Sequence, residues 1–198
     1  MGVPPPAVPE SMLEGWRLRE DREEVPFRAG AISVRAHTLV YEDAERRRQI
    51  REAVGTQGDT VWRFYFASRL RIVPRVPASA VLTRIVESNA TSQFETQLRE
   101  RGFESVERAG RRTLDIEGST ARVARFEAIV PGIGGVDVAA EAHLAVAPGD
   151  REYVLAGGAY PTEVIGSGGA EGTPPDIERF LRPDADRDAL VRLIRSTR

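Results

Sequence analysis

The strongest alternation of hydrophobic and polar residues in the chain runs from Val61 to Val73. Its apolar positions are Trp62, Phe64, Phe66, Leu70 and Ile72, and its polar positions are Arg63, Tyr65, Arg69 and Arg71. A period of two places the two sets of side chains on opposite faces of a β-strand. We therefore predict a long central strand with one buried face and one polar face, around which the other elements pack.

Six further segments have patterns typical of β-strands. They span residues 16–21, 31–41, 106–116, 120–130, 136–146 and 152–160. The fourth and fifth of these segments are joined by the sequence PGIGG, which predicts a hairpin, and the sixth is expected to extend this meander by one strand. A register with Val130 opposite Val136 also places Arg125 opposite Glu141 and gives each face of the hairpin a consistent character.

The longest predicted helix spans residues 79–101. Its apolar residues recur at steps of three or four positions: Leu82, Ile85, Val86, Ala90, Phe94 and Leu98. This single stripe predicts a helix that packs on a sheet. Ser79 is a suitable N-terminal cap and Gly102 a suitable stop, after which Phe103 is expected to fold back onto the core.

Two shorter helices are also predicted. The first spans residues 43–54, with Asp43 as its cap and Gly55 as its stop. The second spans residues 184–197, with aspartates in its first turn and arginines at its end, the distribution that the helix dipole favours.

These elements define the fold class that we expect. It is an α+β fold, in which a mostly antiparallel sheet of six or seven strands carries the long helix on one face and is partly covered by the C-terminal helix on the other. Residues 1–13 contain four prolines and predict an extended, poorly ordered leader, and residues 14–198 predict a single domain. Residues 165–175, IGSGGAEGTPP, predict a mobile glycine-rich loop.

The residue types that are missing exclude many kinds of chemistry. The chain has no cysteine, and all 28 of its basic residues are arginine, so it also has no lysine. Disulfides, thiolate nucleophiles, cysteine zinc sites, Schiff bases and the usual phosphate-binding loop are therefore excluded. The chain has two histidines, His37 and His143, which is too few for a three-histidine metal site. We predict no cofactor.

The charge and hydropathy of the chain bound its partners and location. A formal net charge of −2 argues against nucleic-acid binding by bulk charge. No apolar run approaches the roughly 20 residues of a membrane span. The start, MGVPPPAVPE, lacks the charged segment and apolar core of a signal peptide, although a native precursor that carried one would not show it here.

Three short segments suggest a family. The sequences PPAVPESMLEGW, LVYEDA and AGGAYPTE resemble a group of uncharacterised haloarchaeal proteins, many of them lipoprotein-like. The order of strand, long helix and antiparallel meander is similar to the PsbP-like fold. The first resemblance implies an extracytoplasmic protein tethered through a lipid-modified cysteine. Because this chain has no cysteine, either the tether was removed or this member lacks one.

The two histidines provide one candidate site. Glu141 and His143 alternate onto one strand face, with Asp137 further along, and His37 is a candidate for the same sheet face. Two histidines with a carboxylate can bind a metal, whereas two ordinary surface histidines are the plainer interpretation. Asp137 and Glu141 lie about 13 Å apart on a strand, too far for a glycosidase pair.

The polar face of the central strand provides a second candidate site. Arg63, Arg69 and Arg71, together with Tyr65, form a basic stripe that is able to contact an anion or a partner protein. Pairing of these arginines with carboxylates on neighbouring strands is the alternative.

Glycines and a glycosylation sequon complete the candidates. PGIGG and IGSGG lack the strand–glycine–helix context of a nucleotide-binding loop, so we interpret the first as a hairpin turn. Asn89-Ala90-Thr91 is a sequon, although it falls inside the predicted long helix.

We consider three functional hypotheses. The leading one is a non-enzymatic binding or structural module in an extracytoplasmic setting, with an envelope or protein partner, which acts through an exposed sheet face or beside the glycine-rich loop. The second is a hydrolase or metal-dependent enzyme that uses His37 or His143 with carboxylates. The third is a purely structural domain of the cell envelope.

Overall fold

The fold is built around one antiparallel sheet. The computed structural model describes residues 2–29, 32–55, 62–74, 79–116, 119–133, 135–149, 152–167 and 177–198. Seven strands form the sheet in the order β1-β2-β3-β7-β6-β5-β4, and every neighbouring pair is antiparallel. The predicted α+β class, with an antiparallel sheet of six or seven strands, is therefore confirmed, and the number of strands is seven.

The strands are long and most run close to their predicted positions. They are β1 (Trp16–Ala29), β2 (Ile32–Asp43), β3 (Phe64–Val73), β4 (Glu104–Ile116), β5 (Ser119–Ile133), β6 (Val136–Pro148) and β7 (Glu152–Ser167). Three α-helices complete the fold: α1 (Ala44–Val54), α2 (Ala80–Glu100) and α3 (Pro183–Ser196). Two 3₁₀ turns, Glu10–Met12 and Glu178–Phe180, precede β1 and α3.

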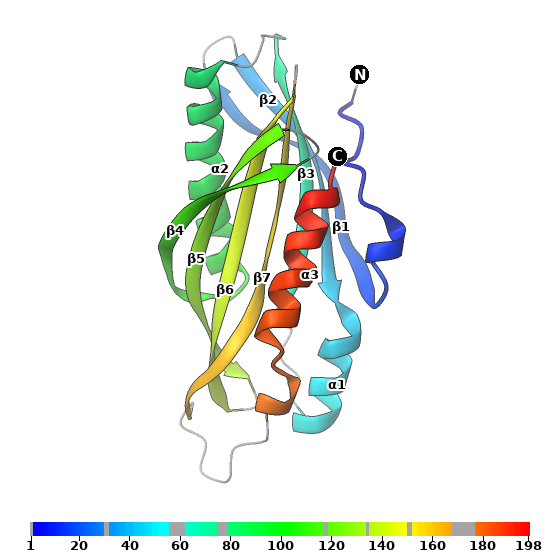
Figure 1. Cartoon of the computed structure of the whole chain (residues 1–198), viewed down its shortest axis with the longest axis vertical. Helices are drawn as coiled ribbons and strands as arrows, with labels where there is room; N and C mark the ends of the chain where they lie inside the picture. Colours follow the sequence, from blue (N-terminus) through cyan, green and yellow to red (C-terminus); the bar gives the residue numbers. More distant parts are fainter. Residues whose placement is uncertain are drawn as a thin grey trace.

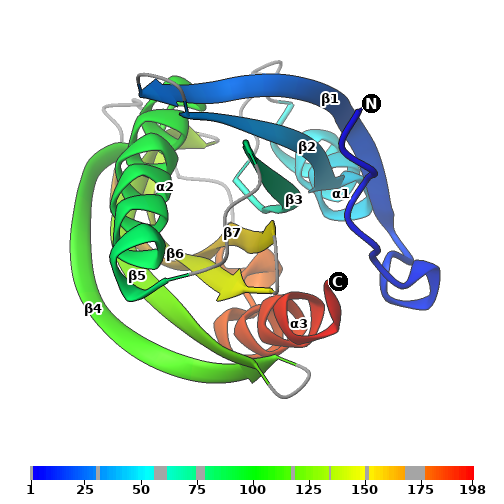
Figure 2. The same ribbon diagram turned by 90° about the horizontal axis from the view of Figure 1, so that it is seen from above.

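The sheet is strongly curved, and helices lie on both of its faces (Figure 1). Figure 2 shows α2 lying inside the curve of the sheet and α3 lying outside it. Two hydrophobic clusters correspond to these faces: one centres on Phe66, Phe94 and Phe126, and the other on Tyr65, Leu190 and Ile194. The expected cover of the second sheet face by the C-terminal helix is thus present.

The helix caps follow the sequence signals. The Asp43 carboxylate accepts a hydrogen bond from the Arg46 backbone N–H at 2.9 Å, and the Ser79 hydroxyl accepts one from the Leu82 N–H at 3.2 Å. Gly55 adopts a left-handed φ of 62° at the end of α1, a conformation that glycine adopts at little cost. These local signals set the helix bounds to within one residue of the prediction.

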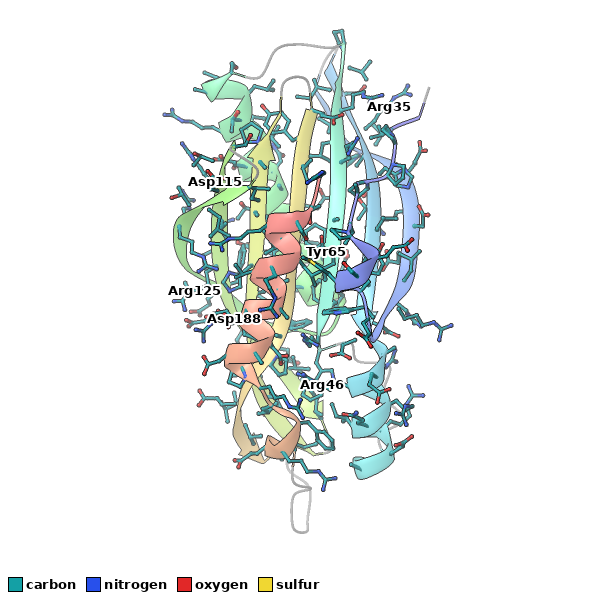
Figure 3. All side chains as sticks on the ribbon, turned by 45° about the vertical axis from the view of Figure 1, so that its right-hand side comes forward. Arg35, Arg46, Tyr65, Asp115, Arg125 and Asp188 are labelled. Carbon is teal, nitrogen blue, oxygen red and sulfur yellow. The ribbon has the colours of Figure 1, made fainter. Side chains whose placement is uncertain are left out.

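The central strand departs from its prediction on one face. Strand β3 is apolar on the α2 face as expected, but its other face is also covered: Tyr65 and Ala67 are fully buried. Figure 3 shows Tyr65 between α3 and the N-terminal segment. The alternating pattern indicated a solvent-exposed face because it contains no information about distant elements. Helix α3, which packs on this face, lies 110 residues or more further along the chain.

The β5–β6 hairpin is confirmed, but its predicted register is wrong by two residues. Val130 pairs with Val138, and Arg125 pairs with His143. Strand β5 continues through Pro131 and Gly132 to Ile133, with a bulge before Ile133 pairs with Val136. The connection is therefore shorter than PGIGG. A shift by two keeps each side chain on its predicted face, because the strand period is two.

Strand β7 occupies the middle of the sheet rather than its end. It pairs with β6 on one side and with β3 on the other, which joins the β1–β3 half to the β6–β4 half. Of the predicted glycine-rich loop 165–175, Ile165, Gly166 and Ser167 continue β7, and the remainder lies outside the described residues.

The two ends of the chain lie side by side. The proline-rich leader packs onto the molecule, and its Val3 is buried. Ala7 and Arg198 exchange two backbone hydrogen bonds of 2.7 and 3.0 Å. The leader and the end of α3 thus form a joint cover over one part of the sheet.

A buried ionic network anchors the start of α3. Asp186 is 1% exposed and forms ion pairs with Arg46 of α1 and with Arg63, the residue just before β3. Asp43 pairs with the same two arginines, and the Arg63 guanidinium lies 4.7 Å from the centre of the Trp16 ring. Four elements are therefore tied together by two acids and two arginines.

Candidate functional site

The two histidines share a sheet face but lie far apart. His37 pairs with Arg69, Arg69 with Val154, and Val154 with Ala147, which is four residues from His143. Three strand spacings and four residues along a strand separate the two rings by about 20 Å. The two histidines therefore lie on the same face of the sheet, as the alternation suggested. The strand order places them too far apart to form one site. Among the described residues, no group of three or more histidine, aspartate or glutamate side chains is arranged to hold a metal.

His143 belongs to a buried polar cluster beneath α3. Its Nε2 lies 2.8 Å from Glu141 Oε1, and the Tyr160 hydroxyl donates to the same oxygen. Because a carboxylate only accepts, Nε2 carries the proton and Nδ1 is left as an acceptor for Arg112, 3.5 Å away. His143 and Tyr160 are each 1% exposed. The cluster therefore holds β6, β7 and β4 together and presents little reactive surface.

Glu141 is strongly stabilised in its charged form. Burial raises its pKa, but hydrogen bonds from His143, Tyr160 and Arg125 outweigh burial and lower the pKa to about 2, from an ordinary value of 4.5. Arg125, labelled in Figure 3, contacts the second carboxylate oxygen at 2.9 Å. Burial, followed by the bond to Glu141, raises the pKa of Tyr160, so its hydroxyl stays protonated.

The Glu141 cluster predicts a loss of stability in acid. A depressed pKa stabilises the fold fully above the unfolded value of 4.5, and this contribution is lost as the pH falls toward about 2. The free energy of unfolding of the wild type should fall across this window by up to about 3 kcal/mol more than that of Glu141→Gln. Chemical denaturation at a series of pH values measures both. Glu127→Gln, which removes a more exposed partner of Arg125, is the control and should keep the wild-type slope.

The basic stripe is covered in the structure. Arg69 donates to the Arg198 carbonyl at 2.9 Å and pairs with Glu152, which also pairs with Arg71. Arg63 belongs to the ionic network at the start of α3, and the Tyr65 hydroxyl is bonded to Thr197. The contact with an anion or a partner protein stays a prediction. It would now require the leader and the end of α3 to move away.

The remaining sequence candidates have structural places. Asp137 accepts a bond from the Gly132 N–H at 3.0 Å and so supports the hairpin. Asn89, of the sequon, is exposed on α2, and its amide donates to the Ile85 carbonyl at 2.8 Å. His37 bonds to the Val3 carbonyl and to Asp21, at 2.8 and 2.7 Å, and thereby fastens the leader.

An apolar groove that the sequence did not reveal lies between α2 and strands β2 and β3. Helix α2 packs most closely against β4 and β6, which leaves it further from β2 and β3. The sheet side of the groove is formed by Val34, Ala36, Phe66, Leu70 and Ile72. The helix side is formed by Leu82, Ile85, Val86, Ala90 and Phe94. Glu24, Asn89, Gln93 and Gln97 also line it and supply polar groups. The space within the groove measures about 90 Å³.

The groove explains an irregularity of the predicted α2 stripe. Val86, Ala90, Phe94 and Leu98 are buried, as the stripe predicts. Ile85 is 44% exposed although it belongs to the same stripe. Ile85 faces the groove rather than a strand, so an apolar residue that appeared to belong to the core contributes an accessible apolar wall.

One polar pair lies among the apolar walls. The hydroxyls of Thr38 on β2 and Ser68 on β3 face each other at 2.8 Å, and both residues are buried and line the groove. Two hydroxyls carry two protons, and the bond between them uses one. The second proton is therefore able to serve an oxygen acceptor in the groove.

The comparisons place the chain in a family. Residues 5–198 match the family described as Domain of unknown function (DUF6517), so the chain belongs to this family. A search of curated proteins found no match. None of the helices in the described part of the chain is long and apolar enough to cross a membrane.

Proposed function

We propose that this family member is a non-enzymatic binding module that holds a slender apolar ligand in the groove between α2 and strands β2 and β3. The observation that carries the proposal is the incompletely filled apolar cavity of about 90 Å³. Protein interiors are normally packed to the density of organic crystals, so an open space with aliphatic and aromatic walls is a site for apolar matter.

The size of the cavity restricts the ligand. Sites for drug-sized molecules are typically about 300–1,000 Å³, several times larger than this one. An alkyl chain fits a narrow groove better than a fused ring system does. Each methylene that leaves water contributes about 0.8 kcal/mol, so a chain of six to eight carbons can supply useful affinity.

The Thr38–Ser68 pair indicates which slender apolar ligands the groove would prefer. A ligand with one neutral oxygen acceptor, such as a ketone or an ester, can accept the unused proton of the pair. A carboxylate would have to be desolvated among apolar walls, which is costly without a cationic partner. We therefore assign the groove to neutral chains with a single acceptor.

A thermal melt with 2-octanone tests the proposal. Ligand at 100 times its dissociation constant should add about 2.7 kcal/mol to the wild-type free energy of unfolding, which raises the melting temperature by several degrees. In Ile85→Glu the new carboxylate stands at the groove wall, and the affinity for 2-octanone should fall at least tenfold.

Val81→Glu is the matched control. Val81 is 68% exposed on the same helix, one turn earlier, and it does not line the groove. It receives the same charge, so its affinity for 2-octanone should equal that of the wild type. No saturable shift in the wild type, or an equal loss in both variants, would overturn the groove as the binding site.

We favour this module over the enzyme that uses His37 or His143 with carboxylates. The two rings lie about 20 Å apart, and each is already bonded to its own carboxylate. A hydrolytic activity that disappears in His37→Gln while the fold is kept would reverse this choice. We also propose that the protein is extracytoplasmic. Its resemblance to haloarchaeal lipoprotein-like proteins supports this location. Fractionation of the tagged protein in its native cells tests it.

A further inference from the structure

A second cleft lies on the other side of α2, between this helix and strands β4 and β5. It measures about 660 Å³. Five arginines from three elements line it: Arg84 on α2, Arg108, Arg111 and Arg112 on β4, and Arg122 on β5. Arg112 is the residue that contacts His143. We call Arg84, Arg108, Arg111 and Arg122, with the space between them, the arginine cleft.

A β-bulge brings the two β4 arginines onto one face. Arg108 pairs with Phe126, and Arg111 pairs with Ala124, with a register shift between Arg108 and Gly110. Phe126 and Ala124 both belong to the α2 face of the sheet. In a regular strand, residues three apart point to opposite faces, so the bulge re-aims Arg111 into the cleft.

The positive charge of the cleft is only partly balanced. Arg122 pairs with Glu87 at 3.1 Å, and Arg108 pairs with Glu95. Arg84 and Arg111 are exposed and have no acidic partner within the part of the chain that the structure describes. This local excess lies on a chain whose formal net charge is −2. The cleft therefore carries a local positive excess on a chain that is slightly acidic overall.

The cleft also has groups that suit a bulky anion. The hydroxyls of Ser88, Thr91 and Thr113 line it, and its floor includes Leu144 and Val146. Guanidinium groups bind phosphate and sulfate oxygens in pairs, and hydroxyls complete such contacts. The volume exceeds what one phosphate needs.

We propose that the arginine cleft binds an anion that carries two or more phosphate groups. The site goes beyond the apolar groove and does not depend on it, because the two are lined by different charged residues and lie on opposite sides of α2. A free polyphosphate compound and the headgroups of an anionic membrane share this chemistry.

Titration calorimetry with inorganic tripolyphosphate, at low and at physiological salt, tests the site. We expect saturable binding that weakens with salt and falls at least tenfold in the double variant Arg84→Gln/Arg111→Gln. The control is Arg192→Gln/Arg195→Gln on α3, which removes the same charge from the opposite sheet face and should bind as the wild type does.

Sedimentation with phosphatidylglycerol vesicles, against phosphatidylcholine vesicles, distinguishes the two sources. Binding of either probe that is lost only in the Arg84/Arg111 variant supports the cleft, and the probe that binds identifies the source. Equal losses in both double variants would show attraction by net charge, and binding of neither probe would show no phosphate site. Either result would overturn the proposal and leave the 2-octanone result unaffected.

Discussion

Replacing Asp186 with asparagine is expected to lower the free energy of unfolding by about 3–5 kcal/mol. The Asp186 side chain is 2% exposed and pairs with Arg46 and Arg63, which are 13% and 11% exposed. The substitution keeps the size of the side chain but leaves two largely buried guanidinium groups with Asp43 as their main acidic partner. Breaking a buried ion pair from one side costs far more than the pair contributes, because the remaining charge stays desolvated.

Asp188→Asn is the control for this prediction. Asp188 is exposed on the same helix (Figure 3) and loses the same charge. Chemical denaturation should place it within about 0.5 kcal/mol of the wild type. Equal small effects of the two substitutions would show that the network does not anchor α3.

Replacing Gly158 with alanine is expected to cost about 3 kcal/mol or more of folding free energy. A Cβ atom at this position would lie 2.1 Å from the Phe64 carbonyl oxygen and 3.1 Å from Leu190 of α3. The oxygen belongs to the backbone of β3, so it cannot rotate away as a side chain could. Strands β3 and β7 would have to separate at the join between the two halves of the sheet.

Gly166→Ala tests the same residue change on the same strand without the clash. A Cβ atom at Gly166 would meet nothing within 4 Å. Its free energy of unfolding should stay within about 0.5 kcal/mol of the wild type. If Gly158→Ala were equally mild, the close approach of β7 to β3 would be contradicted.

Local features of the fold were predictable, and long-range ones were not. The caps Asp43 and Ser79 and the stops Gly55 and Gly102 are short-range signals, so α1 and α2 end where the sequence indicates. The place of β7 between β3 and β6 depends on pairing across about 80 residues, which no periodicity encodes. The buried second face of β3 depends on α3, which lies 110 residues or more further along the chain.

Irregularities in the strands account for the other differences between the predicted and the observed strand pairing. The bulge before Ile133 lengthened β5 and shifted the predicted pairing of Val130 by two residues. A bulge on β4 placed Arg108 and Arg111 on one face. Each bulge inserts an extra residue into one strand and so changes which residues pair across the two strands. Neither bulge is marked by residue types that the alternation of polar and apolar positions would reveal.

The candidate sites show the same difference between local features, which the sequence predicts, and long-range features, which it does not. Alternation suggested the shared face of His37 and His143 correctly, and the strand order made them distant. The apolar groove depends on where α2 sits across the sheet, toward β4 and β6. Leu82, Ile85 and Val86 follow the ordinary three- and four-residue spacing of a packed helix, so the sequence did not reveal the groove.

A two-dimensional NMR titration of the labelled protein with 2-octanone shows directly whether the groove beside α2 binds an apolar ligand. Binding in the groove predicts saturable shift changes at Thr38, Ser68, Val86 and Ala90, with Leu190 of α3 unchanged. Saturable changes at Leu190 instead, or no saturable change at any residue, would contradict the proposal that the groove beside α2 is the functional site.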